Sequence, residues 1–237
     1  MAHHFHPTSL REYDIRGIIG ETLGEADAYA IGRGFGTCLV RAGGKKAAVG
    51  YDGRVSSPML EAALVKGLND SGVDVVRIGM GPTPMLYYAE AVLDDVDGGI
   101  EITGSHNPAN YNGFKMVLMG KPFFGADIQK IGRMASAKEW VNGNGTSEQR
   151  DILDQYVARV AQAAPQKAFR IGWDAGNGAA GPAIEKLVKM LPGEHHLLFV
   201  EVDGQFPNHH PDPTDPANLV DLQRLVAEKQ LDFGVAF

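Results

Sequence analysis

Short apolar runs and helical stripes of apolar residues follow one another along the chain, a pattern typical of alternating strands and helices. The apolar run 47–50 ends in a glycine-containing loop. Ser57-Pro58 then indicates a helix start, because serine caps helix N-termini and proline favours the first turn. Apolar residues recur on one face over 60–68, and a second strand is predicted at 73–78, after Gly72.

The same order of elements returns in the second half of the chain. A predicted strand at 170–173 ends in a glycine-rich loop at 174–178, and a helix at 184–191 and a strand at 197–202 follow. Such self-similarity indicates two domains built on one plan. The remaining predicted elements are a helix at 85–92, strands at 99–103 and 114–119, helices near 152–160 and 219–229, and a strand at 233–237.

The boundary between the two predicted domains is marked by Asn142-Gly143-Asn144-Gly145, since Asn-Gly pairs favour turns and loops. We therefore place the first domain at 1–140 and the second at 141–237. Strands that alternate with helices in both halves predict the α/β fold class.

Composition agrees with a globular chain that buries a core. Of its 237 residues, 44% are hydrophobic and 22% are charged. No apolar stretch approaches the roughly 20 residues that a membrane span needs, and the N-terminus lacks the pattern of a secretory signal. Because Cys38 is the one cysteine, no internal disulfide forms. We expect a cytoplasmic protein with no membrane partner.

The formal net charge of −7 argues against a nucleic-acid partner, because contacts to a phosphate backbone need a basic face. A small anionic substrate stays compatible with this charge, since a few Lys and Arg side chains in a cleft hold one phosphate. We interpret His3, His4 and His6 as part of a flexible N-terminal tail rather than as a metal site.

The segment Thr103–Pro108 is the most informative for chemistry. Gly104 lets the backbone turn sharply before Ser105, and Asn107-Pro108 favours a turn. A serine at the end of a strand in an α/β fold lies where ligands usually bind, outside the carboxyl ends of the strands. The spacing alone fits equally well a turn whose serine hydroxyl only caps a backbone amide.

The adjacency of Ser105 and His106 raises the alternative of a serine hydrolase. Side chains of neighbouring residues usually diverge, so they seldom form a nucleophile–base pair. No Gly-x-Ser-x-Gly elbow surrounds the serine either. The sequence therefore disfavours a hydrolase.

Seven short motifs occur along the chain in a fixed order, and each alone is a weak signal. They are Arg11–Gly17, Gly50–Arg54, Thr103–Pro108, Asn112–Lys115, Asp174–Gly181, Phe206–Pro213 and Asp232–Phe237. Together they resemble the α-D-phosphohexomutase family, specifically its phosphomannomutase/phosphoglucomutase group. The resemblance covers essentially the whole chain from about Leu10 and corresponds to the N-terminal half of such enzymes.

The resemblance implies roles for four residues around one phosphate. Ser105 matches the serine that is phosphorylated in the active enzyme and passes its phosphoryl group to the sugar phosphate. Tyr13 and Arg16 match residues near that phosphoserine, with Arg16 contacting its oxygens. Lys115 matches a lysine beside the phosphoserine with acid–base and charge-stabilising roles.

Three further residues enter the expected site through the same resemblance. His106, which we group with the catalytic residues, and Asn107 match positions that shape the serine loop, and Arg54 is assigned a supporting electrostatic role. These residue types suit phosphate chemistry, because a phosphoserine carries about −1.5 to −2 charges that repel an anionic substrate. Arg and Lys offset that repulsion, and Arg adds bidentate geometry.

The family also implies a fold, an ion and an activator. Each of the two domains is expected to be a mixed β-sheet flanked by helices. Mg²⁺ would bind an oxygen of phosphorylated Ser105 and an Asp-x-Asp-x-Asp loop that follows the strand matching Asp232–Phe237. Glucose 1,6-bisphosphate or an equivalent is the implied activator. Without the later domains, the 237 residues alone are expected to lack turnover and to bind Mg²⁺ poorly.

The resemblance favours an isomerase that interconverts hexose 1-phosphate and hexose 6-phosphate, of mannose and/or glucose, through a phosphoserine and a bisphosphate intermediate. Phosphoglucosamine mutase is the nearest alternative, although the start Tyr13–Gly17 is more similar to the dual-specificity hexose enzymes. A second alternative is a module that binds phosphosugars and has lost catalysis. Retention of Ser105, Arg16 and Lys115 speaks against it.

Other polar residues of the second half are interpreted as structural. The loop at Asp174–Gly178 resembles a phosphate-cradling turn, but no Lys-Ser/Thr follows it as a P-loop requires. We expect His209-His210 to serve structure rather than metal binding. His195-His196 is predicted to precede a strand and to lie on the surface.

Overall fold

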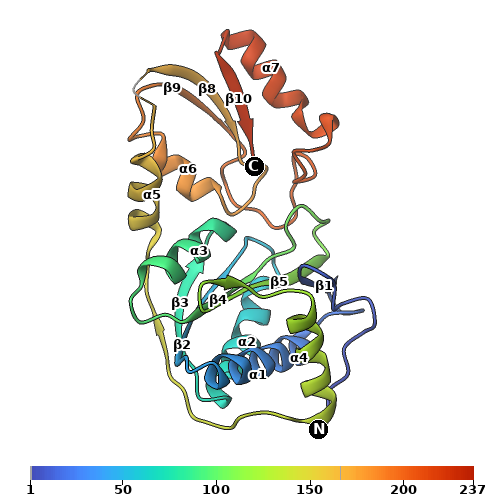
Figure 1. Cartoon of the computed structure of the whole chain (residues 1–237). Coiled ribbons are helices and arrows are strands. Elements are labelled where there is room, and N and C mark those ends of the chain that lie inside the picture. Colours follow the sequence, from blue (N-terminus) through green and yellow to red (C-terminus); the bar gives the residue numbers. More distant parts are fainter. Residues whose placement is uncertain (1, 166) are drawn as a thin grey trace. The chain divides into compact units, whose positions relative to one another are not determined.

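The computed structural model describes residues 2–165 and 167–237, which divide into two compact units. The first unit comprises residues 1–105 and 110–151, and the second comprises 106–109 and 152–237. Strands and helices alternate in both units, so the predicted α/β class is confirmed (Figure 1).

The described strands of the first unit form one mixed sheet in the order β1-β5-β4-β2-β3-β7, with β6 paired to β5. Neighbours among β2, β3, β4 and β7 run parallel, whereas β5 is antiparallel to β4, β1 and β6. The bounds are β1 Ile15–Ile18, β2 Lys46–Tyr51, β3 Asp74–Met80, β4 Gly98–Ile102, β5 Tyr111–Leu118, β6 Lys121–Pro122 and β7 Ser147–Gln149.

Helices cover both faces of this sheet. The helices are α1 Glu25–Arg41, α2 Ser57–Asp70, α3 Thr83–Val92 and α4 Ala126–Ala137. Apolar side chains of α1, α2 and α4 share one buried cluster with Ile100 and Ile102 of β4. Because side chains alternate along a strand, Gly99 and Glu101 point to the opposite face, where Leu86 of α3 lies next to Gly99. Figure 1 shows α3 on the side of the sheet away from α1, α2 and α4.

Helices α1 and α2 cross at a point where two glycines meet. A Cβ added to Gly67 would lie 2.3 Å from the carbonyl oxygen of Tyr29, and one added to Gly32 would lie 2.3 Å from that of Leu64. Real Cβ atoms are excluded at such distances from a backbone. Glycine at both positions therefore allows the two helix backbones to touch.

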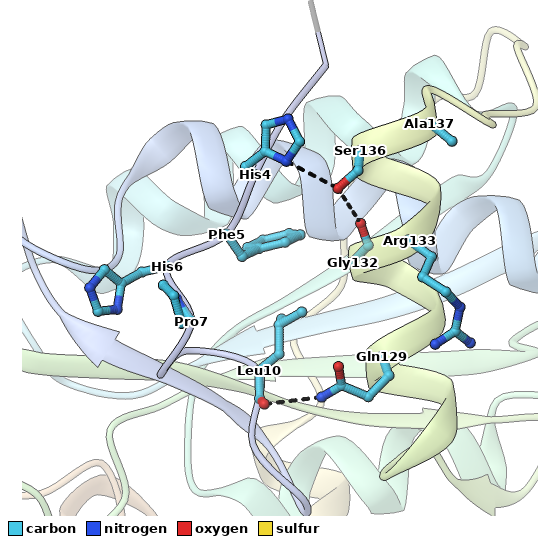
Figure 2. Close-up of a pocket in the computed structure, with 10 residues that line it drawn as sticks. All are labelled: His4, Phe5, His6, Pro7, Leu10, Gln129, Gly132, Arg133, Ser136 and Ala137. Carbon is cyan, nitrogen blue, oxygen red and sulfur yellow. Dashed lines mark hydrogen bonds between the residues drawn. The ribbon is translucent and has the colours of Figure 1, made fainter.

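The N-terminal segment is fixed on the first unit, so the expectation of a flexible histidine tail is wrong. His3 Nε2 lies 2.9 Å from Asp27 Oδ1, and His4 Nδ1 lies 3.2 Å from Ser136 Oγ. Phe5 packs against the main core cluster. Figure 2 shows this segment alongside α4, with an open groove of about 590 Å³ between them. Apolar burial of Phe5 and polar contacts at both ends hold the segment in place.

Phe5→Ala is expected to lower the free energy of unfolding by about 1–3 kcal/mol, because the half-buried ring loses its apolar contacts. Urea unfolding of the two proteins measures the difference. His6→Ala, which removes a neighbouring exposed side chain, is the matched control. Equal stability of Phe5→Ala and the parent chain would show that the segment does not contribute to the fold.

The second unit is built on a three-stranded parallel sheet in the order β10-β8-β9. Its elements are α5 Leu153–Ala161, β8 Phe169–Asp174, α6 Gly181–Leu187, β9 Gly193–Leu198, the 3₁₀ helix η1 Pro216–Leu219, α7 Val220–Lys229 and β10 Phe233–Ala236. Ile171 and Trp173 of β8 share a core cluster with Ile184 of α6. A Cβ added to Gly172 would lie on the opposite face of the sheet, 3.1 Å from Leu222 of α7. Helices thus pack on both faces.

The strand predicted at 197–202 is shifted toward the N-terminus. It begins at Gly193 and ends at Leu198, because Phe199 adopts a left-handed φ of 50° that a strand does not continue through. His195 and His196 therefore lie within β9 rather than before it, and both are partly buried. The indole Nε1 of Trp173 lies 3.1 Å from His195 Nδ1, so the expected surface position of His195 is wrong.

Two helices of the first unit, α1 and α4, are absent from the predicted elements. Helix α1 contains Gly32, Gly34 and Gly36, which local propensity disfavours in a helix. Each glycine faces a closely packed neighbour, and a Cβ on Gly34 would lie 2.8 Å from Ile131 of α4. Tertiary contacts therefore override the local signal.

None of the helices that the structure describes has both the length and the apolarity to cross a membrane.

Candidate active site

Ser105 lies on the loop that follows β4, at the carboxyl end of a strand inside the first sheet. Its side chain is exposed, and its backbone adopts a left-handed φ of 52°. A non-glycine residue in this region is strained by roughly 1–3 kcal/mol, and such strain persists only where surrounding contacts hold it. The serine is therefore fixed in one backbone conformation with its hydroxyl presented to solvent.

Arg54 supplies much of the restraint on this loop. Its Nη2 donates to the carbonyl oxygen of Ser105 at 2.9 Å, and its Nη1 donates to the carbonyl of Tyr111 at 3.1 Å. The two carbonyls belong to opposite ends of the loop between β4 and β5. The backbone N–H of Ser105 donates to Thr103 Oγ1 at 2.8 Å. One guanidinium thus ties the two ends of the serine loop together.

Asp52 in turn holds Arg54. Its Oδ2 accepts from Arg54 Nε at 3.1 Å and from the backbone N–H of Gly104 at 3.0 Å. Its Oδ1 accepts from the Arg54 backbone N–H at 3.1 Å and from the hydroxyl of Ser57 at 2.6 Å. We call Asp52 and Arg54 the loop clamp. The motif Gly50–Arg54 contains Asp52, but no pattern in the sequence indicates that its carboxylate contacts the serine loop.

The start of α2 is joined to β5 beside this clamp. Buried Asn112 donates from Nδ2 to the hydroxyls of Ser56 and Ser57, both at 2.9 Å. Since Ser57 also donates to Asp52, the hydrogen bonds form one connected network from α2 to the serine loop. Helix α2 begins at Ser57, but the N-cap residue is Ser56 and not the predicted Ser57. The Ser57 hydroxyl bonds Asp52 instead of capping the helix.

Gly104 is required by the position of the guanidinium. A Cβ at residue 104 would lie 2.3 Å from Arg54 Nε and 2.4 Å from Cζ. The buried Arg54 side chain has no room to retreat, since it is 1% exposed and bonded on several sides. The glycine before the serine thus serves the clamp as well as the sharp turn predicted from the sequence.

Two arginines concentrate positive charge near Ser105. Burial lowers the pKa of Arg54, Asp52 opposes that shift, and the positive charge of Arg16 lowers it further. Arg16 pairs with Asp14, and its Nε is buried without a hydrogen-bond partner in the part of the chain that the structure describes. A buried N–H that lacks an acceptor is costly. An anion beside Arg16 would satisfy it.

Lys115 and Tyr13 line a shared pocket of about 250 Å³ together with Tyr87, Met116, Pro122, Phe123 and Phe124. Tyr13 is 77% exposed and stacks on Phe124 with ring centroids 6.3 Å apart. Lys115 and Arg16 point to the same face of the sheet, since Arg16 is paired with Gly113, two residues before Lys115. Within residues 2–165 and 167–237, Lys115 forms no ion pair. The resemblance had grouped Lys115 with Arg16 and Tyr13.

His106 and Asn107 continue the serine loop. His106 is exposed, Asn107 is half-buried, and the structure gives no hydrogen bond between the His106 ring and the Ser105 hydroxyl. A nucleophile–base pair of these two residues is therefore not formed, in line with the sequence argument against a hydrolase.

The residues present do not make a complete metal site. In the described ranges, no group of three or more His, Cys, Asp or Glu side chains is placed to hold a metal ion. Phosphorylated as the resemblance implies, Ser105 would offer a single oxygen. The described residues thus supply at most a part of the Mg²⁺ site that the resemblance implies.

The glycine-rich loop after β8 is organised by contacts of the buried Asp174 carboxylate. His209 Nε2 lies 3.0 Å from Asp174 Oδ2, and Asp174 Oδ1 accepts from the backbone N–H of Gly176 at 2.8 Å. Asn177, with a left-handed φ of 57°, donates from Nδ2 to the carbonyl of Glu201 at 2.8 Å. The contact of His209 with buried Asp174 fits the structural interpretation of that histidine.

Comparison with known proteins agrees with this geometry. The family described as phosphoglucomutase/phosphomannomutase, alpha/beta/alpha domain I, matches residues 7–142, and its domain II matches residues 154–237. This chain belongs to the phosphoglucomutase/phosphomannomutase family. The resemblance that the seven motifs carried is therefore confirmed.

The similarity to relatives and solved structures of the phosphoglucomutase/phosphomannomutase family extends over nearly the whole chain. A phosphomannomutase/phosphoglucomutase of Pseudomonas putida is 44% identical over 233 residues, covering 98% of this chain and 50% of its own length. A phosphoglucomutase of Neisseria gonorrhoeae is 43% identical over 231 residues, with coverages of 96% and 50%. A family structure from Burkholderia thailandensis has a TM-score of 0.93 and 43% identity, covering 98% of this chain and 53% of its own. The chain thus spans about half the length of these relatives.

Proposed function

We propose that a protein carrying this chain interconverts hexose 1-phosphate and hexose 6-phosphate, of mannose and/or glucose, with Ser105 as its phosphate carrier. The observation that supports this most is the exposed Ser105, held at φ 52° by Arg54, in a chain of the phosphoglucomutase/phosphomannomutase family. The relatives named above are phosphomannomutases or phosphoglucomutases, which favours a hexose phosphate over a glucosamine phosphate.

In the proposed reaction the phosphoryl group moves between two oxygens of one hexose by way of Ser105. The bond between phosphorus and Ser105 Oγ breaks while a bond forms between phosphorus and the oxygen of the free sugar hydroxyl. The proton of that hydroxyl passes through a base to Ser105 Oγ, which becomes a hydroxyl again. This gives a hexose bisphosphate. The phosphoryl group that the sugar carried originally then moves to Ser105 Oγ. The serine proton passes through the base to the sugar oxygen from which phosphorus departs. Glucose 1,6-bisphosphate charges Ser105 initially as the activator.

The charges of the site suit this transfer. Phosphorylated Ser105 and the sugar phosphate together carry about −3 to −4 charges. Arg16, with its buried and unsatisfied Nε, and Lys115, on the same face, offset them, while Arg54 holds the backbone of the serine. Phosphoryl transfer depends mainly on alignment and charge stabilisation. Lys115 is the side chain we assign to charge stabilisation and proton transfer.

Ser105→Ala is expected to lower the mutase turnover of a protein of the relatives' full length by at least about a thousandfold, because no oxygen remains to carry the phosphoryl group. A coupled assay with glucose 1-phosphate and mannose 1-phosphate measures it. Ser136→Ala, which changes an exposed serine on α4, is the matched control and should retain activity. Undiminished turnover in Ser105→Ala would refute the assignment.

A further inference from the structure

Glu101 is a buried carboxyl group without a partner, one residue before the end of β4. It is 1% exposed, and its Oε1 is buried with no hydrogen bond to any described residue. Glu61 in the same unit is equally buried but accepts two hydrogen bonds from Arg77, at 2.6 and 2.5 Å. An unpaired carboxylate in such surroundings is costly, and a carboxyl group avoids the cost by keeping its proton.

The Glu101 side chain lies next to β2, the strand that leads to Asp52. In the register of the sheet Glu101 is paired with Gly50 of β2, and a Cβ at Gly50 would lie 2.5 Å from Glu101 Oε2. The carboxyl group therefore lies against the backbone of β2, two residues before Asp52. Glycine at residue 50 makes room for it.

The titratable groups that face Glu101 come from three elements. Asp52 follows β2, Tyr87 lies on α3, and Lys115 is its register partner on β5. Lys115 is not within ion-pair distance of Glu101 in the described chain. Burial, and after it the negative charge of Asp52, raises the pKa of Glu101 well above its ordinary value. The charge that acts on the pKa of Glu101 is thus one that opposes ionisation.

We propose that Glu101 is a positioning residue that stays protonated in the folded chain, and that loss of its proton loosens the hold of Asp52 and Arg54 on the Ser105 loop. A second negative charge beside Asp52 repels the carboxylate that binds Arg54 and the Gly104 N–H. This effect on the loop does not depend on the proposed mutase activity.

The sign of the pH dependence follows from proton binding. Above the ordinary glutamate pKa of 4.5, the unfolded chain releases this proton while the folded chain retains it. The contribution of Glu101 to stability therefore falls as pH rises from there until the raised folded pKa is passed. Glu101→Gln keeps the shape and lacks the titration, so it removes this loss and is more stable at neutral pH.

Amide hydrogen exchange at Gly104 tests the proposal, because that N–H is bonded to Asp52 Oδ2. After correction for intrinsic rates, we expect its protection in the 237-residue chain to fall at least about tenfold from pH ~5 to pH ~9. In Glu101→Gln it should change less than about twofold. Glu61→Gln, which changes an equally buried but paired carboxyl group, is the matched control and should retain the fall.

Equal pH dependence in the parent chain and Glu101→Gln would overturn the proposal. A carbon-13 titration of the Glu101 carboxyl in the parent chain gives a test that needs no variant. A neutral carboxyl signal at pH ~6 is expected, and a carboxylate signal there would also overturn it.

Discussion

Arg54→Met is expected to lower the free energy of unfolding by about 3–5 kcal/mol, because it breaks a buried ion pair and leaves one partner uncompensated. The side chain of Arg54 is fully buried, and that of Asp52 is 15% exposed. The substitution also removes the hydrogen bonds to the carbonyls of Tyr111 and Ser105. Methionine approximates the length of the apolar stem, so the loss reports mainly the missing guanidinium.

Urea unfolding of the parent chain and Arg54→Met measures this difference. Arg133→Met is the matched control, because Arg133 is exposed on α4, and it should change stability by less than about 0.5 kcal/mol. A loss for Arg54→Met no larger than that of the control would contradict the description of Asp52 and Arg54 as a clamp. In a protein of full length, the same variant should also slow phosphorylation of Ser105, since the loop conformation is no longer held.

Gly67→Ala is expected to destabilise the first unit by about 3 kcal/mol, although helix propensity alone favours alanine by about 1 kcal/mol. The added methyl would lie 2.3 Å from the carbonyl oxygen of Tyr29 and 3.0 Å from the backbone nitrogen of Arg33. Both contacts are to the backbone of α1, which does not move aside as a flexible side chain does. The two helices must therefore separate, and the core below them loses contact.

The sign of this change is the decisive result. Thermal and urea unfolding of Gly67→Ala give it, and Gly24→Ala serves as control because a Cβ there meets no atom within 4 Å. Gly24 precedes α1, so its substitution costs less than about 1 kcal/mol through the weaker cap. Stabilisation by Gly67→Ala would mean that α1 and α2 do not cross in backbone contact.

The sequence predicted those elements in which a local signal coincided with burial. Helix α2 begins at Ser57, where a proline in the first turn and a one-sided apolar stripe act together. Helix α1 was missed because its three glycines oppose a helix locally, and only contacts with α2 and α4 make them favourable. The strand predicted at 197–202 lies too far toward the C-terminus, because the apolar run in the sequence continues past Phe199. The backbone leaves the strand conformation at that residue.

The site was predictable as a set of residues and not as a network. The motifs identified Ser105, Arg54 and Arg16, and the structure adds that Arg54 bonds the Ser105 carbonyl while Arg16 Nε has no acceptor. Asp52 and Glu101 were not singled out, because the importance of Asp52 comes from its bonds to Ser57 and Gly104 and that of Glu101 from its burial. A linear pattern does not display such neighbours. Gly50 indicates that a buried Glu101 side chain lies beside it only when the register of β2 and β4 is known.

Phosphosite mapping tests the central claim most directly. A protein that contains this chain at the length of its relatives is incubated with glucose 1,6-bisphosphate, digested, and its peptides are examined by mass spectrometry. We predict one phosphoryl group on Ser105 of the parent protein and none at that position in Ser105→Ala. A parent protein that turns over substrate while its phosphate resides on another residue, or on none, would contradict the account.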